Sequence, residues 1–489
     1  MTKKIAIIGS GFSGITAAAY CAKAGDEVHV FEKNDRLGGR ARQFKTDNGY
    51  VFDMGPSWYW MPDVIEKFFT DFNDLRSNYF ELLQLNPQFE MVFADGGLHI
   101  PASYEELRTL CETLEKGGAK QLDAFMKEAQ EKYEISMNQF IYKPSLSWTE
   151  FASITIAKSA FKLQILTSFK KHIRQFFTHP KLIALMEFPV LFLVAMPEDT
   201  PAMYSLMNYG GYKLGTWYPE GGFASLVDAM VKVAKKQGVH FHLQTNVEQI
   251  VTAQGKATHV KVNGDLIPFD VVISAADYHH TEQQLLKKEE QNYTSAYWDQ
   301  KTFAPSCLIY YLGFDKKIPN LQHHTLFFEN DLDQHADEIY KNKKWPSKPL
   351  FYACCPSKSD PIVAPEGHEN VFLLMPIATG LHDTEALRET YFKEMIKRLE
   401  KHTQTQDLEK SLDYKKSYCI VDFKSDYNAF EGNAYGLANT LRQTAVLKPS
   451  IRNKQIKNLF YTGQLTVPGP GVPPSIISGN IVANQVIKL

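Results

Sequence analysis

The chain has 489 residues, of which 44% are hydrophobic, 13% aromatic and 22% charged. This composition is typical of a globular protein and excludes collagen-like, coiled-coil and disordered chains. The 53 basic and 55 acidic residues leave a formal net charge of −2, so no field of one sign favours nucleic acid as a partner.

Neither a signal peptide nor a membrane span is expected. Met1 to Lys4 lead directly into an apolar strand and then glycines, and the longest apolar stretch, Leu182 to Met196, is interrupted by Glu187 and Pro189. Six cysteines without a C-x-x-C motif indicate reduced, structural thiols rather than a disulfide framework. These features predict a soluble or peripheral protein in a cytosol-like compartment.

The first 32 residues predict a dinucleotide-binding βαβ unit of Rossmann type. An apolar strand over Ile5 to Ile8 precedes a glycine-rich turn and a helical pattern that ends near Gly25, and a second strand over Glu27 to Phe31 closes on Glu32. The turn consists of Gly9, Ser10, Gly11, Phe12, Ser13 and Gly14.

Each glycine of the turn has a physical task. Gly9 permits the tight turn, Gly11 lets a pyrophosphate approach the backbone, and Gly14 allows close packing of helix on strand. Glu32 can accept hydrogen bonds from the ribose hydroxyls, and its charge would repel the 2′-phosphate of an NADP-type ligand. The alternative is a glycine-rich turn without a ligand.

The residues after Glu32 favour FAD over NAD. Lys33 and the sequence Gly38-Gly39-Arg40 resemble a segment of the amine oxidase-like flavoprotein superfamily, in which two adjacent glycines follow the acidic residue that binds the ribose. The resemblance implies that backbone amides of this loop and Arg40 contact the cofactor, with Arg40 as the cation beside its phosphates. Alternatively, Arg40 and Arg42 are plain surface charges.

The C-terminal segment also resembles that superfamily. A strand over Leu459 to Thr462 ends at Gly463, and a Pro/Gly loop leads to a helix that starts near Ser475. The resemblance implies that Gly463 approaches the pyrophosphate and that Gly471, Val472 and Pro473 lie by the flavin ring, where a helix N-terminus would stabilise negative charge. The alternative is an ordinary proline-rich terminal loop.

Two aromatic segments in the middle of the chain are candidates for a substrate tunnel. The segment from Gly49 to Pro62 resembles the one that passes the flavin ring in the superfamily, which assigns Gly55, Pro56 and Ser57 to the cofactor. The aromatic residues are Trp58, Tyr59, Trp60 and, in a glycine-bounded turn further on, Trp217. They can equally belong to the core.

Residues 64–160 contain amphipathic helical stretches, for example Pro101 to Cys111. In residues 151–196, Leu163, Ile165, Leu166 and Phe169 alternate with lysines in a pattern that suits a helix lying on an anionic membrane. An ordinary cap domain with a solvated basic face would have the same pattern.

The pattern further along predicts a return to the first sheet. Four elements follow one another: a helix over Ser225 to Gly238, a strand over Val239 to Leu243, a hairpin around Asn263-Gly264 and a strand from Asp270. Within this stretch, Val247 matches the valine that contacts the adenine in the superfamily. We therefore expect an α/β fold with a discontinuous FAD-binding domain, an inserted α+β substrate domain and a helical membrane-facing cap. The boundaries are 1–62, 220–285 and 440–489 for the first domain, 63–110 and 286–439 for the second, and 111–219 for the cap.

Other chemistry is not indicated. The chain lacks the GxSxG, HExxH, Walker A and EF-hand motifs, and no catalytic acid or base can be assigned. The pairs His279-His280 and His323-His324 would point to opposite faces of a strand, so we expect no metal.

The whole chain resembles the bacterial and fungal phytoene desaturase family of carotenoid biosynthesis. The residues that carry the resemblance are Gly9 to Gly14, Glu32 to Arg40, Phe52 to Pro62, Gly215 to Gly222, Ser274 to Asp277 and Thr462 to Gly479, with Gln464 as a departure. The family's chemistry implies hydride transfer from a linear carotenoid to FAD with loss of a proton, on the inner face of the cell membrane, with a quinone or oxygen as the electron acceptor.

Four alternatives stay open. A 1-hydroxycarotenoid 3,4-desaturase and a carotenoid isomerase would share the cofactor and the apolar tunnel. A non-catalytic isoprenoid binder, as in the GDP-dissociation inhibitors of small GTPases, would lack the intact glycine fingerprint that this chain keeps. An amine oxidase would require an aromatic cage and a cationic substrate.

Overall fold

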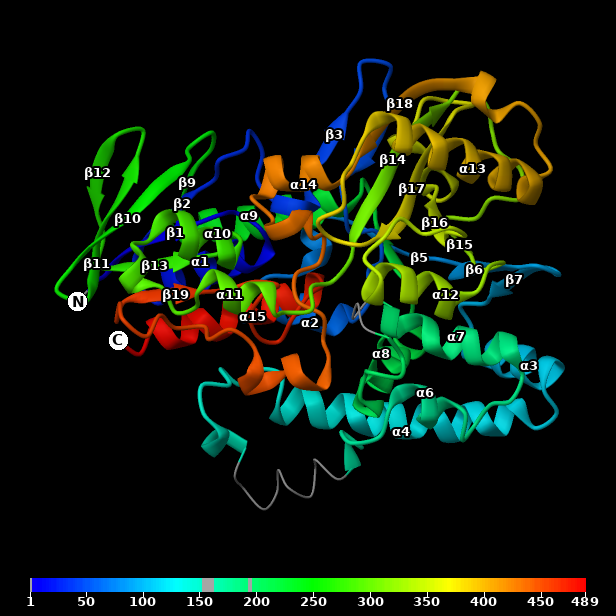
Figure 1. The fold of residues 1–489 in the computed structure, drawn as a ribbon, viewed down its shortest axis with the longest axis horizontal. Helices are drawn as coiled ribbons and strands as arrows, with labels where there is room; N and C mark the ends of the chain where they lie inside the picture. The colour runs from blue at the N-terminus through cyan, green and yellow to red at the C-terminus, as the bar shows by residue number, and fades with distance from the viewer. Residues whose placement is uncertain (1, 152–161, 192–195) are drawn as a thin grey trace.

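The computed structural model describes residues 2–151, 162–191 and 196–489 (Figure 1). A five-stranded sheet has the order β19-β13-β1-β2-β9, and every neighbouring pair in it is parallel. Its strands are β1 (Lys4–Ile8), β2 (Glu27–Phe31), β9 (His240–His242), β13 (Val271–Ser274) and β19 (Leu459–Tyr461). The sheet confirms the predicted βαβ unit. It also confirms that the strand expected from Asp270 and the strand expected over Leu459 to Thr462 belong to the same sheet.

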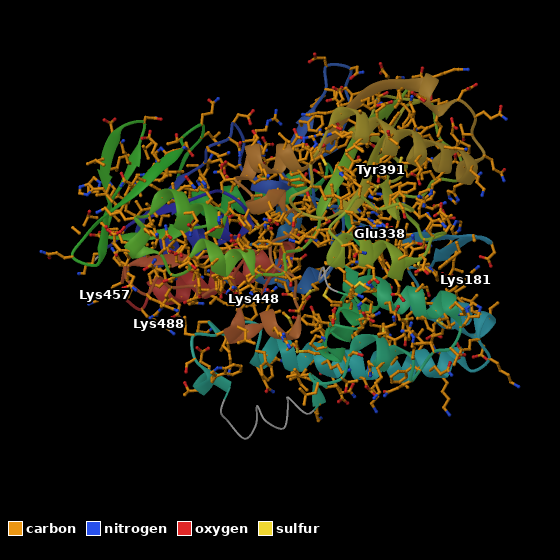
Figure 2. All side chains as sticks on the ribbon, viewed as in Figure 1. Lys181, Glu338, Tyr391, Lys448, Lys457 and Lys488 are labelled. Atoms are coloured by element: carbon orange, nitrogen blue, oxygen red, sulfur yellow. The ribbon has the colours of Figure 1, made fainter. Side chains whose placement is uncertain are left out.

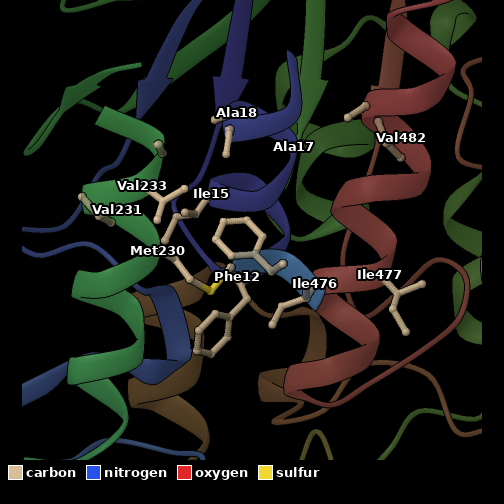
Figure 3. Packing of buried hydrophobic residues seen from close by; sticks show 14 of the residues in the cluster. Phe12, Ile15, Ala17, Ala18, Met230, Val231, Val233, Ile476, Ile477 and Val482 are labelled. Carbon is tan, nitrogen blue, oxygen red and sulfur yellow. The ribbon is translucent and has the colours of Figure 1, made fainter. Parts of the chain in front are cut away.

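Three helices pack on this sheet: α1 (Phe12–Lys23), α9 (Phe223–Lys236) and α15 (Val472–Val486). Figure 3 shows Phe12 and Ile15 of α1 between Met230 of α9 and Ile476 of α15. A Cβ on Gly479 would lie 2.4 Å from the Ser13 carbonyl oxygen, so glycine is required for α15 to approach α1 this closely. The predicted terminal helix is confirmed, with an earlier start that places Pro473 and Pro474 in its first turn.

The two ends of the chain meet at this sheet. Lys3 Nζ donates a hydrogen bond to the carbonyl oxygen of Val486 at 3.2 Å. Lys457 and Lys488 extend outward at the same end of the molecule (Figure 2). An antiparallel sheet of β10 (Val247–Ala253), β11 (Lys256–Val262) and β12 (Asp265–Pro268) projects beside it and contains the predicted hairpin.

A second sheet has seven strands in the order β18-β14-β17-β16-β15-β6-β7, and within it β15 and β6 pair in parallel. Its strands are β6 (Phe89–Phe93), β7 (Gly96–Ile100), β14 (Ser306–Phe314), β15 (His324–Phe327), β16 (Phe351–Cys354), β17 (Glu369–Ile377) and β18 (Leu412–Tyr418). Helix α13 (Glu385–Thr403) lies over one face. Strands β6 and β7 are not individually predicted from the sequence, whereas the helical stretch expected from Pro101 to Cys111 is present as the helix over Tyr104–Leu114.

Helices α3 (Tyr104–Leu114), α4 (Gly118–Gln139), α6 (Phe169–Ile173), α7 (Pro180–Leu191) and α8 (Leu206–Asn208) form a layer along the lower edge of Figure 1. Leu163 and Phe169 are buried in this layer, whereas Leu166 is 95% exposed. The described part of 151–196 is not one long amphipathic helix, because α6 and α7 are separate helices, and most of its apolar side chains face the protein. Residues 152–161 and 192–195 lie outside the described residues.

The remaining elements connect these layers. They are β3 (Gln43–Lys45), β4 (Val51–Asp53), β5 (Leu82–Gln84), β8 (Trp217–Pro219), α2 (Pro62–Asp71), α10 (Tyr278–His280), α11 (Ser295–Asp299), α12 (Leu332–Ala336) and α14 (Ile420–Tyr427). All six cysteines are unpaired and buried, as predicted. Among the described residues, no helix is both long and apolar enough to cross a bilayer.

One expectation about histidines is wrong. His323 precedes β15 instead of lying in it, so strand alternation does not separate the two side chains, and the ring centroids of His323 and His324 are 4.5 Å apart. His279 and His280 lie in the short helix α10 and not in a strand.

Candidate FAD and substrate cavity

A large cavity extends from the carboxyl ends of β1 and β2 to the seven-stranded sheet. At one end, backbone and polar groups line it, from the glycine turn, Glu32, the loop 38–40, Gly55 to Ser57, residues 245–247 and the segment 463–475. The charged residues in the described lining all belong to this polar end: Glu32, Lys33, Arg40, Asp277 and Asp426. Ligands bind at this position in open α/β sheets, beyond the carboxyl ends of the strands.

The backbone of the glycine turn leaves room for a ligand to approach it closely. Gly9 has a φ of +97°, which favours glycine, and its N–H donates to the Phe31 carbonyl oxygen at 2.8 Å. A Cβ on Gly14 would lie 2.2 Å from the Gly9 carbonyl oxygen, so Gly14 serves the packing of α1 on β1. A Cβ on Gly11 would have no described protein atom within 4 Å, because Gly11 faces the cavity.

Arg40 lies on the second loop, which packs against the first through a 3.0 Å hydrogen bond from Gly38 N–H to the Ser10 carbonyl oxygen. The guanidinium is stacked 4.8 Å from the Tyr427 ring, and its Nη2 donates to the Asn433 carbonyl oxygen at 3.3 Å. Its buried Nε has no partner in the described residues. A desolvated cation with an unused donor suits an anionic phosphate, so the surface-charge alternative is excluded for Arg40.

Asp277 is a site residue that sequence reasoning missed, although the stretch Ser274 to Asp277 carries part of the resemblance. It lines the cavity, caps α10 by accepting from His280 N–H at 3.1 Å, and keeps its Oδ2 without a partner among the described residues. Burial raises the pKa of Asp277 to about 6, and the Arg40 cation opposes that shift.

Glu32 is held in place at the end of β2. Its Oε2 accepts from the Ser10 N–H at 3.0 Å and the Ser10 hydroxyl at 2.6 Å, and its Oε1 accepts from Asn34. Lys33 lines the cavity, but its ammonium group donates to the Ser425 carbonyl oxygen and to Asn428. A carboxylate fixed in this way, in a cavity that Val247 also lines, suits a ribose.

The C-terminal segment completes the polar end. Gly463 has a φ of +112°, and its N–H donates to the Ser478 hydroxyl at 3.0 Å, which ties the end of β19 to α15. Gly471 precedes the first turn of α15, where Val472 and Pro473 also line the cavity. The N-terminus of α15 thus faces the cavity with its positive dipole end.

The structure brings together nearly all the residues that the sequence predicts to bind the cofactor. Gly14 is the exception: it is not among the described residues that line the cavity, because it packs against the Gly9 carbonyl oxygen behind the turn. Of the aromatic candidates, Trp58 and Trp60 line the cavity and Tyr59 and Trp217 do not. Backbone alternation turns Tyr59 into the core against Phe223, and Trp217 is held in β8, where its indole N–H donates to the Leu214 carbonyl oxygen.

The other end of the cavity is apolar. Its walls include Trp58, Trp60, Phe188, Leu326, Phe328 and Leu374. His335 also lines this end, but its Nδ1 accepts from Leu350 N–H and its Nε2 lies 3.0 Å from the Pro376 carbonyl oxygen, so it is a neutral wall residue. The contributions of β15 to β17 cannot be recognised from sequence, because strands that are buried on both faces have no polar alternation.

Comparison with known proteins places this geometry in a family. Residues 12–487 match the family of flavin-containing amine oxidoreductases. A carotenoid 3,4-desaturase of Haloarcula japonica is 38% identical over 99% of this chain and 98% of its own length. A 4,4′-diapophytoene desaturase of Staphylococcus aureus is 29% identical over 99% of both chains.

Solved structures agree on the fold. An oxidoreductase from Methanosarcina mazei superposes with a TM-score of 0.62 at 17% identity, covering 98% of this chain and 100% of the other. A putrescine oxidase with bound putrescine has a TM-score of 0.61 at 13% identity, with complete coverage of both chains.

The chain therefore belongs to the flavin-containing amine oxidoreductases. Within that class it belongs to the carotenoid desaturases, and it is an oxidoreductase that acts on CH–CH bonds with FAD as its cofactor. The residues present fit FAD: the open side of Gly11, the buried Nε of Arg40 and the fixed carboxylate of Glu32 match a pyrophosphate and a ribose.

Proposed function

We propose that the protein desaturates a long linear carotenoid, in the direction from phytoene to lycopene. The apolar end of the cavity carries this proposal, because the charged residues of the described lining lie at the nucleotide end. A hydrocarbon has no polar group for a protein to hold, so only a matching apolar channel can orient one of its C–H bonds. The same feature disfavours a cationic amine as substrate.

Bound FAD supplies the acceptor for the hydride. The chain's own residues position the reactants and exclude water. Arg40 and Glu32 would hold the cofactor at the polar end, while Trp58 and Phe188 form apolar walls in the same cavity as the segment Gly55 to Ser57. Because reacting atoms must approach to about 3–3.5 Å, the rigidity of these walls sets the position of the substrate.

We also propose that the protein takes its substrate from the inner face of the cell membrane and passes electrons to a quinone or oxygen. Trp148 is 66% exposed and Leu166 95% exposed, in segments on either side of residues 152–161. Exposed apolar side chains beside lysines suit a peripheral contact with anionic lipid. Leu166→Asp should lower the fraction of protein that sediments with anionic liposomes, whereas Leu266→Asp, on the remote strand β12, should leave it unchanged.

The direct test incubates the FAD-loaded protein with liposomes that contain phytoene, and separates the pigments by chromatography. Coloured, conjugated products such as lycopene would support the proposal. Unchanged phytoene with a reducible bound flavin would contradict it. Parallel anaerobic reactions with and without added quinone identify the acceptor.

A second candidate is 3,4-desaturation of a 1-hydroxycarotenoid, and the 38% identity to the carotenoid 3,4-desaturase of Haloarcula japonica favours the 3,4-desaturation. The same liposomes loaded with a 1-hydroxycarotenoid test it. A product that differs only in double-bond geometry would instead indicate an isomerase, and protein that binds no flavin would indicate an isoprenoid binder.

A further inference from the structure

A buried cluster of three potential metal ligands lies behind the wall of the cavity. It consists of His323, His324 and Cys354, whose donor atoms all lie within 4.8 Å of one another. His324 and Cys354 are direct cross-strand partners in the antiparallel pair of β15 and β16, so their side chains share a face of the sheet. His323 is tied to the same strands because its carbonyl oxygen accepts from Cys355 N–H at 2.8 Å.

The hydrogen bonds of the two imidazoles leave one nitrogen of each unused. His323 Nδ1 lies 2.9 Å from the Ser359 hydroxyl, and His324 Nδ1 lies 2.6 Å from the Tyr352 hydroxyl. Both Nε2 atoms are buried without a hydrogen-bond partner anywhere in the described part of the chain. If each Nδ1 donates its proton to the adjacent hydroxyl, each Nε2 presents a lone pair, which is the arrangement that supports metal-bound histidines.

All three side chains of the cluster are buried, each with an exposed fraction of 4% or less. Neutral imidazoles are the form that binds metal. Their burial with unpaired nitrogens is costly unless another group completes the site.

Space for one more ligand lies beside Cys354. A cavity of about 20 Å³ is lined there by Asp53, Tyr218 and Cys354 among others, which is enough for one water molecule. The Asp53 carboxylate accepts hydrogen bonds from Gln43 and Phe223 N–H and brings negative charge to the same cavity. Two imidazoles, a thiolate and water are a ligand set typical of tetrahedral zinc.

We propose that His323, His324 and Cys354 bind one Zn²⁺ ion, with water as the fourth ligand, and that this ion joins β15 to β16 behind the cavity. Zinc at about 2.1 Å from nitrogen and 2.3 Å from sulfur requires donor atoms about 3.5 Å apart, so the ligand atoms, which lie within 4.8 Å of one another without an ion, would move closer together on binding. The Cys354 proton leaves to solvent as the thiolate forms, and no redox change is involved.

The ion would act on the substrate wall through His324. The Trp58 ring, which lines the cavity, is stacked on the His324 ring with centroids 4.1 Å apart and planes 12° apart. Fixing the imidazole therefore fixes the indole. The role is structural, because none of the three ligands lines the cavity itself.

The test uses tag-free, FAD-loaded protein that has been dialysed against a chelator and is then titrated with Co²⁺. We expect one equivalent to bind and to produce a thiolate-to-cobalt charge-transfer band in the difference spectrum, which one equivalent of Zn²⁺ removes. Cys354→Ser should abolish the band. The matched control is Cys355→Ser, since the neighbouring buried thiol contacts Ser357 and is not part of the cluster.

A second variant, which should disturb folding less than Cys354→Ser, tests the same site. Ser359→Ala removes only the hydroxyl at His323 Nδ1 and should weaken cobalt binding about 10–100-fold with flavin content unchanged. Absence of saturable binding by the wild type, or a charge-transfer band that survives Cys354→Ser or disappears in Cys355→Ser, would overturn the proposal. None of these readouts depends on which carotenoid the enzyme uses.

Discussion

At the scale of single residues, two glycines of one turn show how the cofactor site is built. Gly14 is required by the protein, because its missing side chain lets α1 reach the Gly9 carbonyl oxygen. Gly11 leaves space open on the cavity side, since no described protein atom lies within 4 Å of a Cβ built there, and we expect FAD to need that space. Two glycines of one motif therefore serve different purposes, one the packing of α1 and the other the space for a ligand.

Substitution separates these constraints. Gly14→Ala should lower the free energy of unfolding of the apoprotein by about 1–3 kcal/mol through overpacking. Gly11→Ala should change it by less than about 1 kcal/mol, the usual effect at a helix N-cap, but weaken FAD binding at least about tenfold. Urea unfolding and flavin titration measure the two quantities, and equal effects of both variants on stability would contradict this division.

Arg40 is the second residue whose role can be tested by itself. Arg40→Gln should weaken FAD binding by about 10–100-fold, because a charge-assisted hydrogen bond contributes about 1.5–3 kcal/mol. Arg42→Gln is the control, since Arg42 is paired with Asp426 and does not line the cavity. An equal loss of FAD affinity in both variants would argue against a direct phosphate contact by Arg40.

At the scale of elements, the helical layer is held by a buried amine on α4. Lys132 Nζ lies within hydrogen-bond distance of Gln164, Ser205 and the Ala202 carbonyl oxygen, and its side chain is 2% exposed. It also lies 3.1 Å from His172 Nε2. One group thus joins α4 to the segments around α6 and α8.

This amine predicts a pH dependence of stability. Burial lowers the pKa of Lys132 from 10.5 to about 8, so the stability that its neutral form contributes is present above pH 10.5 and is lost as the pH falls through 8. Relative to Lys132→Met, the wild type should lose about 2–3 kcal/mol between pH 10.5 and 7. Chemical denaturation across this range checks it, with Lys127→Met, an exposed change on the same helix, as the control. Parallel curves for the wild type and Lys132→Met would contradict it.

At the scale of the whole molecule, the cofactor site joins the two ends of the chain. The glycine turn near residue 10 and the loop near residue 470 face one cavity, and the seven-stranded sheet closes its far end. A ligand that contacts all these parts binds only the folded chain, so its binding energy adds to the stability of the entire protein.

FAD should accordingly raise the free energy of unfolding by about 2.7 kcal/mol at a free concentration about 100 times its dissociation constant. ADP should give a smaller increase at the same concentration, because it lacks the flavin that we expect to lie beside Gly471 to Pro473. Thermal unfolding at several ligand concentrations measures both. Equal shifts with ADP and FAD would mean that the C-terminal loop contributes nothing to binding.

The nucleotide end of this protein can be read from the order of its residues. Its signals are local: a glycine turn, a ribose acid at the end of the next strand and a Pro/Gly loop before a helix depend on backbone conformations that few residues allow. Residues from Gly9 to Arg40 and from Gly463 to Pro473 can therefore be assigned to one site from sequence alone.

The substrate end and the ligand cluster behind it depend on tertiary packing instead. The sequence predicts Tyr59 and Trp217 in the tunnel, but backbone direction turns Tyr59 into the core and strand pairing holds Trp217 in β8. The register of β15 against β16 brings Cys354 to His324, and the start of β15 after His323 brings that residue to the same place. Such neighbours are far apart in the chain, and burial on both faces removes the polar alternation that would reveal them.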